Sequence, residues 1–226
     1  ATSMDVQQFR FPRLTPTVKK LLIGLVAAFV AIAIAQNLLR LPLFAWLALD
    51  LRDLWGSLFV NLLWQPFTYW LVHPPVPTAL FDFLMILLGI YFFLAPFEEA
   101  FGAKRTIQLA AAGIASTALA TILLALVVGG PVVAGAAPIA LASLGAFPAI
   151  AGNREILFLF VVPMKAWHVI LLGLGIAALA ALLAADPFVF VEHAAALGGG
   201  YGFARWMTRP RVPKKQAASR QPKRKS

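Results

Sequence analysis

The chain contains no cysteine and little charge. Without cysteine it can form no disulfide, thiolate metal site or cysteine nucleophile. Only 12% of its 226 residues are charged and 61% are hydrophobic, whereas soluble domains average about 25% charged residues. So few polar side chains cannot cover the surface of a water-soluble domain. The composition therefore excludes a soluble enzyme and a compact nucleic-acid-binding domain, and predicts an all-α integral membrane protein.

Long apolar runs predict six transmembrane helices. They cover about residues 21–39, 78–97, 106–128, 139–152, 157–184 and 187–207. The first is an uncharged run of 19 residues, long enough for a hydrocarbon core of about 30 Å. The fourth is short, about 21 Å at 1.5 Å per residue. The expected organisation is an N-terminal segment 1–20, a membrane domain 21–207 and a basic tail 208–226.

The distribution of basic residues predicts the orientation. Six crossings place 17 of the 19 Lys and Arg residues on one side and leave Arg40 and Arg52 on the other. Because cytoplasmic loops carry the excess of Lys and Arg, we expect both termini to be cytoplasmic. The tail 209–226 holds eight of these residues and no acid. It is expected to be solvated, or to bind anionic lipid or an acidic protein. Nucleic acid is not expected as a partner, since no aromatic residues are interleaved.

The segment 40–77 between the first two helices is neither a polar loop nor a clean span. It mixes four tryptophans (Trp46, Trp55, Trp64 and Trp70) with Asp50, Arg52 and Asp53. Because indole rings favour the headgroup level, the segment is predicted to lie in the membrane interface. An additional membrane helix is the alternative.

Ser143 and His193 are the candidate catalytic residues. Counted from the expected starts of the fourth and sixth helices, they lie roughly 8 Å and 10 Å along the helix axes, entered from the same side. A serine beside a histidine is the minimum for an activated nucleophile. A glycine-rich face that includes Gly200 would let the two helices approach closely. The alternative is that Ser143 is an ordinary small packing residue.

Four motifs resemble the rhomboid superfamily of intramembrane serine proteases. Trp64, Thr68 and His73 resemble the family's segment leading into its second helix; Glu98 and Gly102 resemble its Glu-x-x-x-Gly turn. Residues 162–167 are similar to the entry of its fifth helix, and His193 with Gly200 to its catalytic histidine and glycine face. The resemblance implies a six-helix bundle in the bacterial inner membrane, lipid and other transmembrane proteins as partners, and no cofactor. His73, His168 and His193 do not have metal-site spacing.

Several positions depart from the family's catalytic pattern. Its Gly-x-Ser-Gly stretch corresponds to Leu141-Ala142-Ser143-Leu144, and an alternative alignment puts Leu144 in the nucleophile's place. Thr78 and Asp82 stand at the positions that would help to hold the oxyanion, where an ionised Asp82 would repel the negative charge.

Three functions follow from these patterns. The first is an inactive rhomboid-like protein, a pseudoprotease that binds transmembrane helices or serves as a subunit of a membrane complex. The second is an active protease, with Ser143 as nucleophile and His193 as general base. The third is a transporter or channel, in which Asp82 and Glu192 would mark an ion path.

Overall fold

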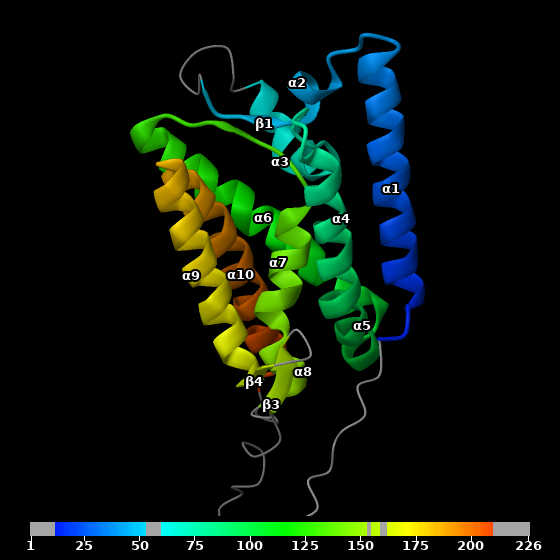
Figure 1. Cartoon of the computed structure of the whole chain (residues 1–226), viewed down its shortest axis with the longest axis vertical. Helices are drawn as coiled ribbons and strands as arrows, with labels where there is room; N and C mark the ends of the chain where they lie inside the picture. Colours follow the sequence, from blue (N-terminus) through cyan, green and yellow to red (C-terminus); the bar gives the residue numbers. More distant parts are fainter. Residues whose placement is uncertain (1–11, 53–59, 153–154, 159–161, 210–226) are drawn as a thin grey trace, which may run out of the picture.

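The computed structural model describes residues 12–52, 60–152, 155–158 and 162–209. Four helical stretches are long and apolar enough to cross a membrane: α1 (Pro16–Asn37), Ala79–Phe101, α6 (Ala103–Val128) and α9 (Ala166–Ala184). Helices dominate the described chain, and the strands are confined to two short two-stranded sheets. The expected all-α membrane class is therefore confirmed, and Figure 1 shows α1 and α9 running roughly along the long axis while α6 crosses the bundle obliquely.

The stretch Ala79–Phe101 contains a change of helical pitch. It consists of α4 (Ala79–Gly89), a π-helical turn η4 (Ile90–Leu94) and α5 (Ala95–Phe101). Pro96 follows the turn at the start of α5. Because proline lacks an amide hydrogen and its ring crowds the carbonyl four residues earlier, a widened turn before it keeps the helix continuous.

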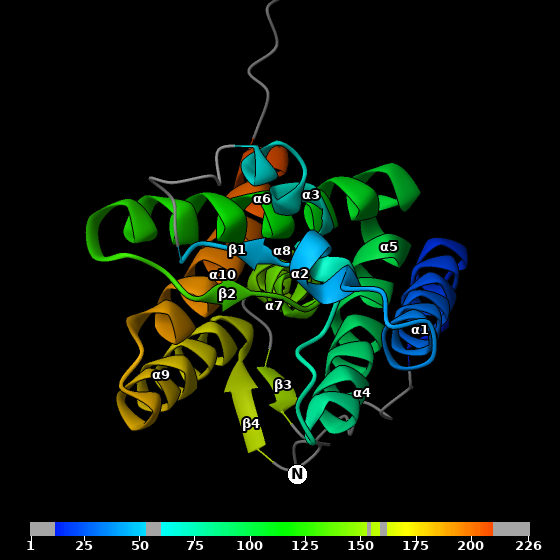
Figure 2. The ribbon, with the colours of Figure 1, turned by 90° about the horizontal axis from the view of Figure 1, so that it is seen from above.

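A short helix occupies the centre of the bundle. This is α7 (Ala137–Ala146), which is followed by the single turn α8 (Pro148–Ala151). Viewed from above, α7 lies between α4, α6, α9 and α10 (Pro187–Met207) (Figure 2). Helix α10 begins after Asp186, whose carboxylate accepts a hydrogen bond from the Phe188 amide at 2.8 Å, an N-cap that fixes this boundary.

Glycines bring α6, α7 and α10 into backbone contact. A Cβ added at Gly200 would lie 2.0 Å from the Ala142 carbonyl oxygen, and one at Gly145 would lie 2.1 Å from that of Leu197. At Gly113, on α6, a Cβ would lie 2.5 Å from the Pro138 carbonyl oxygen. Small residues permit such approaches, which strengthen packing between membrane helices. The expected close contact between the fourth and sixth apolar segments is thus present.

Two boundaries differ from the sequence prediction. The fifth apolar segment becomes helical at Ala166, not near residue 157, because β3 (Glu155–Phe158) and β4 (Val162–Lys165) pair as an antiparallel hairpin. Pro163 cannot donate a helical hydrogen bond, which explains the extended backbone before α9. At the other end of the chain α1 begins at Pro16, so it takes in the last part of the expected N-terminal segment.

The segment between α1 and α4, here termed the outer segment, folds over the end of the bundle where α1 finishes and α10 begins, here termed the outer end. It contains α2 (Leu43–Leu47), β1 (Leu49–Asp50), η2 (Asn61–Leu63), α3 (Gln65–Thr68) and η3 (Tyr69–Leu71). Strand β1 pairs antiparallel with β2 (Val132–Val133), in the linker before α7. Figure 1 shows these short elements at one end of the long helices. Trp55 and Asp53 lie outside the described residues.

Candidate functional site

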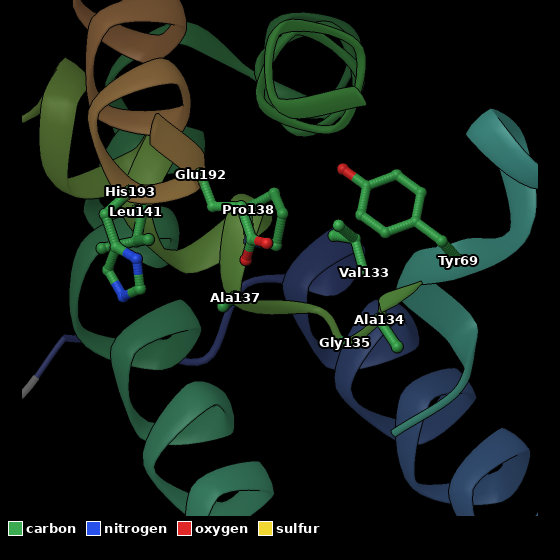
Figure 3. Close-up of a pocket in the computed structure, with 9 residues that line it drawn as sticks. All are labelled: Tyr69, Val133, Ala134, Gly135, Ala137, Pro138, Leu141, Glu192 and His193. Carbon is green, nitrogen blue, oxygen red and sulfur yellow. The ribbon is translucent and has the colours of Figure 1, made fainter. Parts of the chain in front are cut away.

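A small cavity lies beneath the outer segment, at the outer ends of α7 and α10. Its volume is about 20 Å³, room for one water molecule. Tyr69 lies on one side and His193 on the other, with Glu192 beside His193 (Figure 3). The remaining lining residues come from β2, the β2–α7 linker and α7: Val133, Ala134, Gly135, Ala137, Pro138 and Leu141.

The ring of His193 is oriented by its own helix. Its Nδ1 lies 2.7 Å from the carbonyl oxygen of Val189. A carbonyl oxygen only accepts hydrogen bonds, so Nδ1 carries the hydrogen that it donates. In the neutral ring Nε2 is therefore the nitrogen that can accept a hydrogen bond.

The side chain of Ser143 does not reach this cavity. It is 0% exposed, its hydroxyl donates to the Ala140 carbonyl oxygen at 2.7 Å, and it is not among the residues that line the cavity. Within the described part of the chain, no hydrogen bond joins it to His193. The α7 residues that line the cavity with His193 are Ala137, Pro138 and Leu141 (Figure 3).

The helix contacts explain this separation. Ser143 lies between Ala142 and Gly145, which contact Gly200 and Leu197 of α10. These two α10 residues follow His193 by four and seven positions, roughly 6 and 10 Å along the helix. Ser143 is therefore one to two turns deeper than His193, rather than at the similar depth expected from the helix starts, because the two helices begin at different heights.

Thr78 and Asp82, the predicted oxyanion positions, lie at the outer start of α4. The Thr78 hydroxyl donates to an Asp82 carboxylate oxygen at 2.8 Å, and both residues are exposed. Neither lines the cavity with His193. The pair therefore satisfies polar groups at a helix start, and the structure does not bring it to Ser143 or His193.

His73 is buried among aromatic rings near the outer ends of α1 and α4. It is 9% exposed, and its ring makes edge contacts with Phe29 and Phe83 at centroid distances of 5.5 Å and 4.7 Å. Neither ring nitrogen has a hydrogen-bond partner in the described chain. Burial lowers the pKa of His73 to about 4, against a smaller opposite effect of Asp82.

The other motif residues hold structural elements together. The Trp64 indole donates to the Trp46 carbonyl at 2.8 Å, and the Thr68 hydroxyl to that of Leu47 at 2.9 Å. The two residues thereby fix the outer segment. Gly200 contacts α7, as described above.

Glu98 and Gly102 organise the opposite end of the bundle. The Glu98 carboxylate accepts from the amides of Thr17 and Val18 at 3.0 Å and 2.9 Å, and from the Thr15 hydroxyl. It thus satisfies free amides at the start of α1, where negative charge is stabilised. Gly102 joins α5 to α6 at φ +78°, a conformation that favours glycine.

The sequence predicts only an ion path for Glu192 and no site role for Tyr69. The signal for Glu192 was its place in an apolar helix, where an ionisable group by default indicates function. Tyr69 gave no such signal, because its position depends on the outer segment folding back over α6. Its hydroxyl donates to the Ile114 carbonyl at 2.9 Å.

The side chains of this cavity can form hydrogen bonds and electrostatic interactions with a ligand. They lack the serine–histidine hydrogen bond that activates a nucleophile. Among the described residues, no group of three or more His, Cys, Asp and Glu side chains could hold a metal ion. No protein family model matches the chain, and comparison with curated protein sequences finds no significant match.

Proposed function

We propose that this chain is a rhomboid-like membrane protein that binds transmembrane helices without cleaving them, either alone or as a subunit of a membrane complex. The observation that carries the proposal is the cavity beside His193. There α7 contributes the apolar side chain of Leu141, while the Ser143 hydroxyl is buried and bonded to its own helix. A hydrolytic site needs its nucleophile hydrogen-bonded to its base.

A six-crossing topology is part of the proposal. It adds the short α7 and the 21-residue α10 to the four long apolar stretches. The arrangement of the ends supports it, since α1 begins and α10 finishes at the same end of the bundle (Figure 1). Lys19, Lys104 and Arg205 lie near that end, which the positive-inside rule makes cytoplasmic. The proposed location is the bacterial inner membrane.

The outer segment is proposed to sit at the headgroup level of the opposite leaflet. Trp46 and Trp64 are 55% and 38% exposed, and exposed indoles favour this level. The polar contacts of Thr68 and Trp64 with backbone carbonyls keep the segment folded on the bundle. In this position it would cover the cavity from the outer side.

Labelling with a fluorophosphonate probe tests the proposal against proteolysis. Wild type, Ser143→Ala and the control Ser116→Ala would be tagged, solubilised from native membranes and treated with the probe. Ser116 is a suitable control because its hydroxyl also donates to a carbonyl of its own helix, that of Gly113 at 3.1 Å. We expect no labelling of any variant, and the same co-purifying membrane proteins with each.

Labelling that is present in wild type and Ser116→Ala but absent from Ser143→Ala would overturn the proposal in favour of an active protease. Loss of the co-purifying proteins in Ser143→Ala alone, with normal folding, would also contradict it. Retention of a stable complex by all three variants would support a helix-binding role.

A further inference from the structure

Glu192 is the one cavity residue with a formal charge, and the proposed function does not use it. It is half-buried in α10 and lines the cavity beside His193. Within the described residues, no hydrogen bond or ion pair reaches its carboxylate. A carboxylate at membrane depth is costly to keep and is expected to have a partner.

When Glu192 is ionised, the side chains around the cavity supply an acceptor and no available donor. The carboxylate of Glu192 accepts hydrogen bonds. The donors of the two other polar groups are committed elsewhere: the Tyr69 hydroxyl to Ile114 and Nδ1 of His193 to Val189. The remaining lining side chains are apolar. A ligand for this cavity should therefore be a hydrogen-bond donor.

The electrostatic surroundings favour a cation. Asp186 interacts electrostatically with Glu192 and adds negative charge at the start of α10. The described basic residues at this end are Arg40 and Arg52, and Arg52 pairs with Asp50. Neither arginine forms an ion pair with Glu192, so its carboxyl group has no cationic partner among the described residues.

We propose that the cavity binds a primary ammonium group, with Glu192 as counter-ion. An ammonium carries three donors and a compact charge, whereas a guanidinium is a larger planar fork. A volume of about 20 Å³ suits a group the size of one water molecule. The ammonium is that of a lysine near the outer end of a bound transmembrane helix, an assignment that rests on the proposed function.

A pair of peptides tests this recognition. The purified full chain and a fluorescent apolar transmembrane peptide would be reconstituted in phosphatidylcholine vesicles, and binding followed by energy transfer. One peptide carries a lysine about one turn inside its outer end; its partner carries norleucine there. Charge-assisted hydrogen bonds predict about tenfold tighter binding of the lysine peptide to wild type.

Three variants assign the effect to the cavity. The preference for lysine should disappear in Glu192→Gln and persist in Glu192→Asp, which keeps the charge. It should also persist in Glu99→Gln, the same chemical change at an exposed position on the opposite end of the bundle. Equal binding of the two peptides to wild type, or a preference unchanged in Glu192→Gln, would overturn the proposal.

A second arm separates the ammonium site from helix binding. Titration of the solubilised protein with methylammonium measures ligand binding to the cavity in the absence of a transmembrane partner. If neither peptide binds, the proposed function fails; saturable methylammonium binding that is lost in Glu192→Gln would then support the site, with a soluble amine as its ligand. Absence of both peptide preference and methylammonium binding would refute the site itself.

Discussion

The imidazole of His73 is buried without a hydrogen-bond partner in the described chain, so the fold stabilises its neutral form. An unfolded histidine has a pKa near 6.5, whereas that of folded His73 is about 4. Between these values the unfolded state binds more protons. His73 therefore lowers the free energy of unfolding as the pH falls from about 6.5 to 4, by at most about 3 kcal/mol, and adds no further change below pH 4.

This pH dependence should be visible in thermal unfolding. We expect the melting temperature of wild type in detergent to fall between pH 7.5 and pH 5, and that of His73→Phe to fall less. Phenylalanine keeps edge contacts with Phe29 and Phe83 but cannot bind a proton. Identical pH profiles for the two proteins would show that His73 is not buried as described.

Ser143 should tolerate loss of its hydroxyl but not an increase in size. Its hydrogen bond to Ala140 is a local helical one, so Ser143→Ala is expected to cost less than about 1 kcal/mol of unfolding free energy. Ser143→Leu adds bulk beside the closely packed Ala142 and should cost about 1–3 kcal/mol. Denaturant titration of both variants would check this order, and the reverse order would contradict the buried position.

At the level of helices, Glu98 connects α5 to the start of α1. Glu98→Gln should weaken this contact by about 1–2 kcal/mol, because it removes the charge that two amides and a hydroxyl contact. Faster proteolytic cleavage near the start of α1 would report the loss. Glu99→Gln, one residue away and exposed, should leave the cleavage rate unchanged; equal rates in both variants would refute this role.

Neighbouring glycines of α10 provide a matched comparison of helix packing. Gly200→Ala places a methyl group against the α7 backbone and should destabilise the protein by at least about 2 kcal/mol. At Gly198 nothing lies within 4 Å of an added Cβ, so Gly198→Ala should be neutral or slightly stabilising. Unfolding in a denaturing detergent measures both, and similar stabilities would argue against the close α7–α10 contact.

The sequence predicted features that depend on local residues, such as helix ends, but not those that depend on how helices pack together. Pro187 and Met207 were predicted as the ends of the last helix, and the glycines of α10 signalled a close contact. Whether the Ser143 side chain reaches His193 could not be predicted, because this depends on how α7 and α10 are shifted along each other. The start of α9 was also missed, since an apolar strand such as Val162–Lys165 looks like helix by hydropathy alone.

For the whole molecule, the proposed topology places Lys19 and Arg205 on one side of the membrane and Arg40 on the other. The absence of cysteine makes this measurable without background. We expect Lys19→Cys and Arg205→Cys to react with an impermeant maleimide only in inverted membrane vesicles. Arg40→Cys should react only in intact cells. Labelling of all three from one side would exclude the six-crossing arrangement.

The central position of α7 has a consequence for biogenesis. A ten-residue helix extends roughly 15 Å, half of the hydrocarbon thickness, so it gains little from entering lipid by itself. It becomes stable only when surrounded by α6, which is synthesised before it, and α10, which is synthesised after it. Assembly must therefore wait for the ribosome to finish α10, and a chain truncated before Pro187 should be a substrate for membrane quality control.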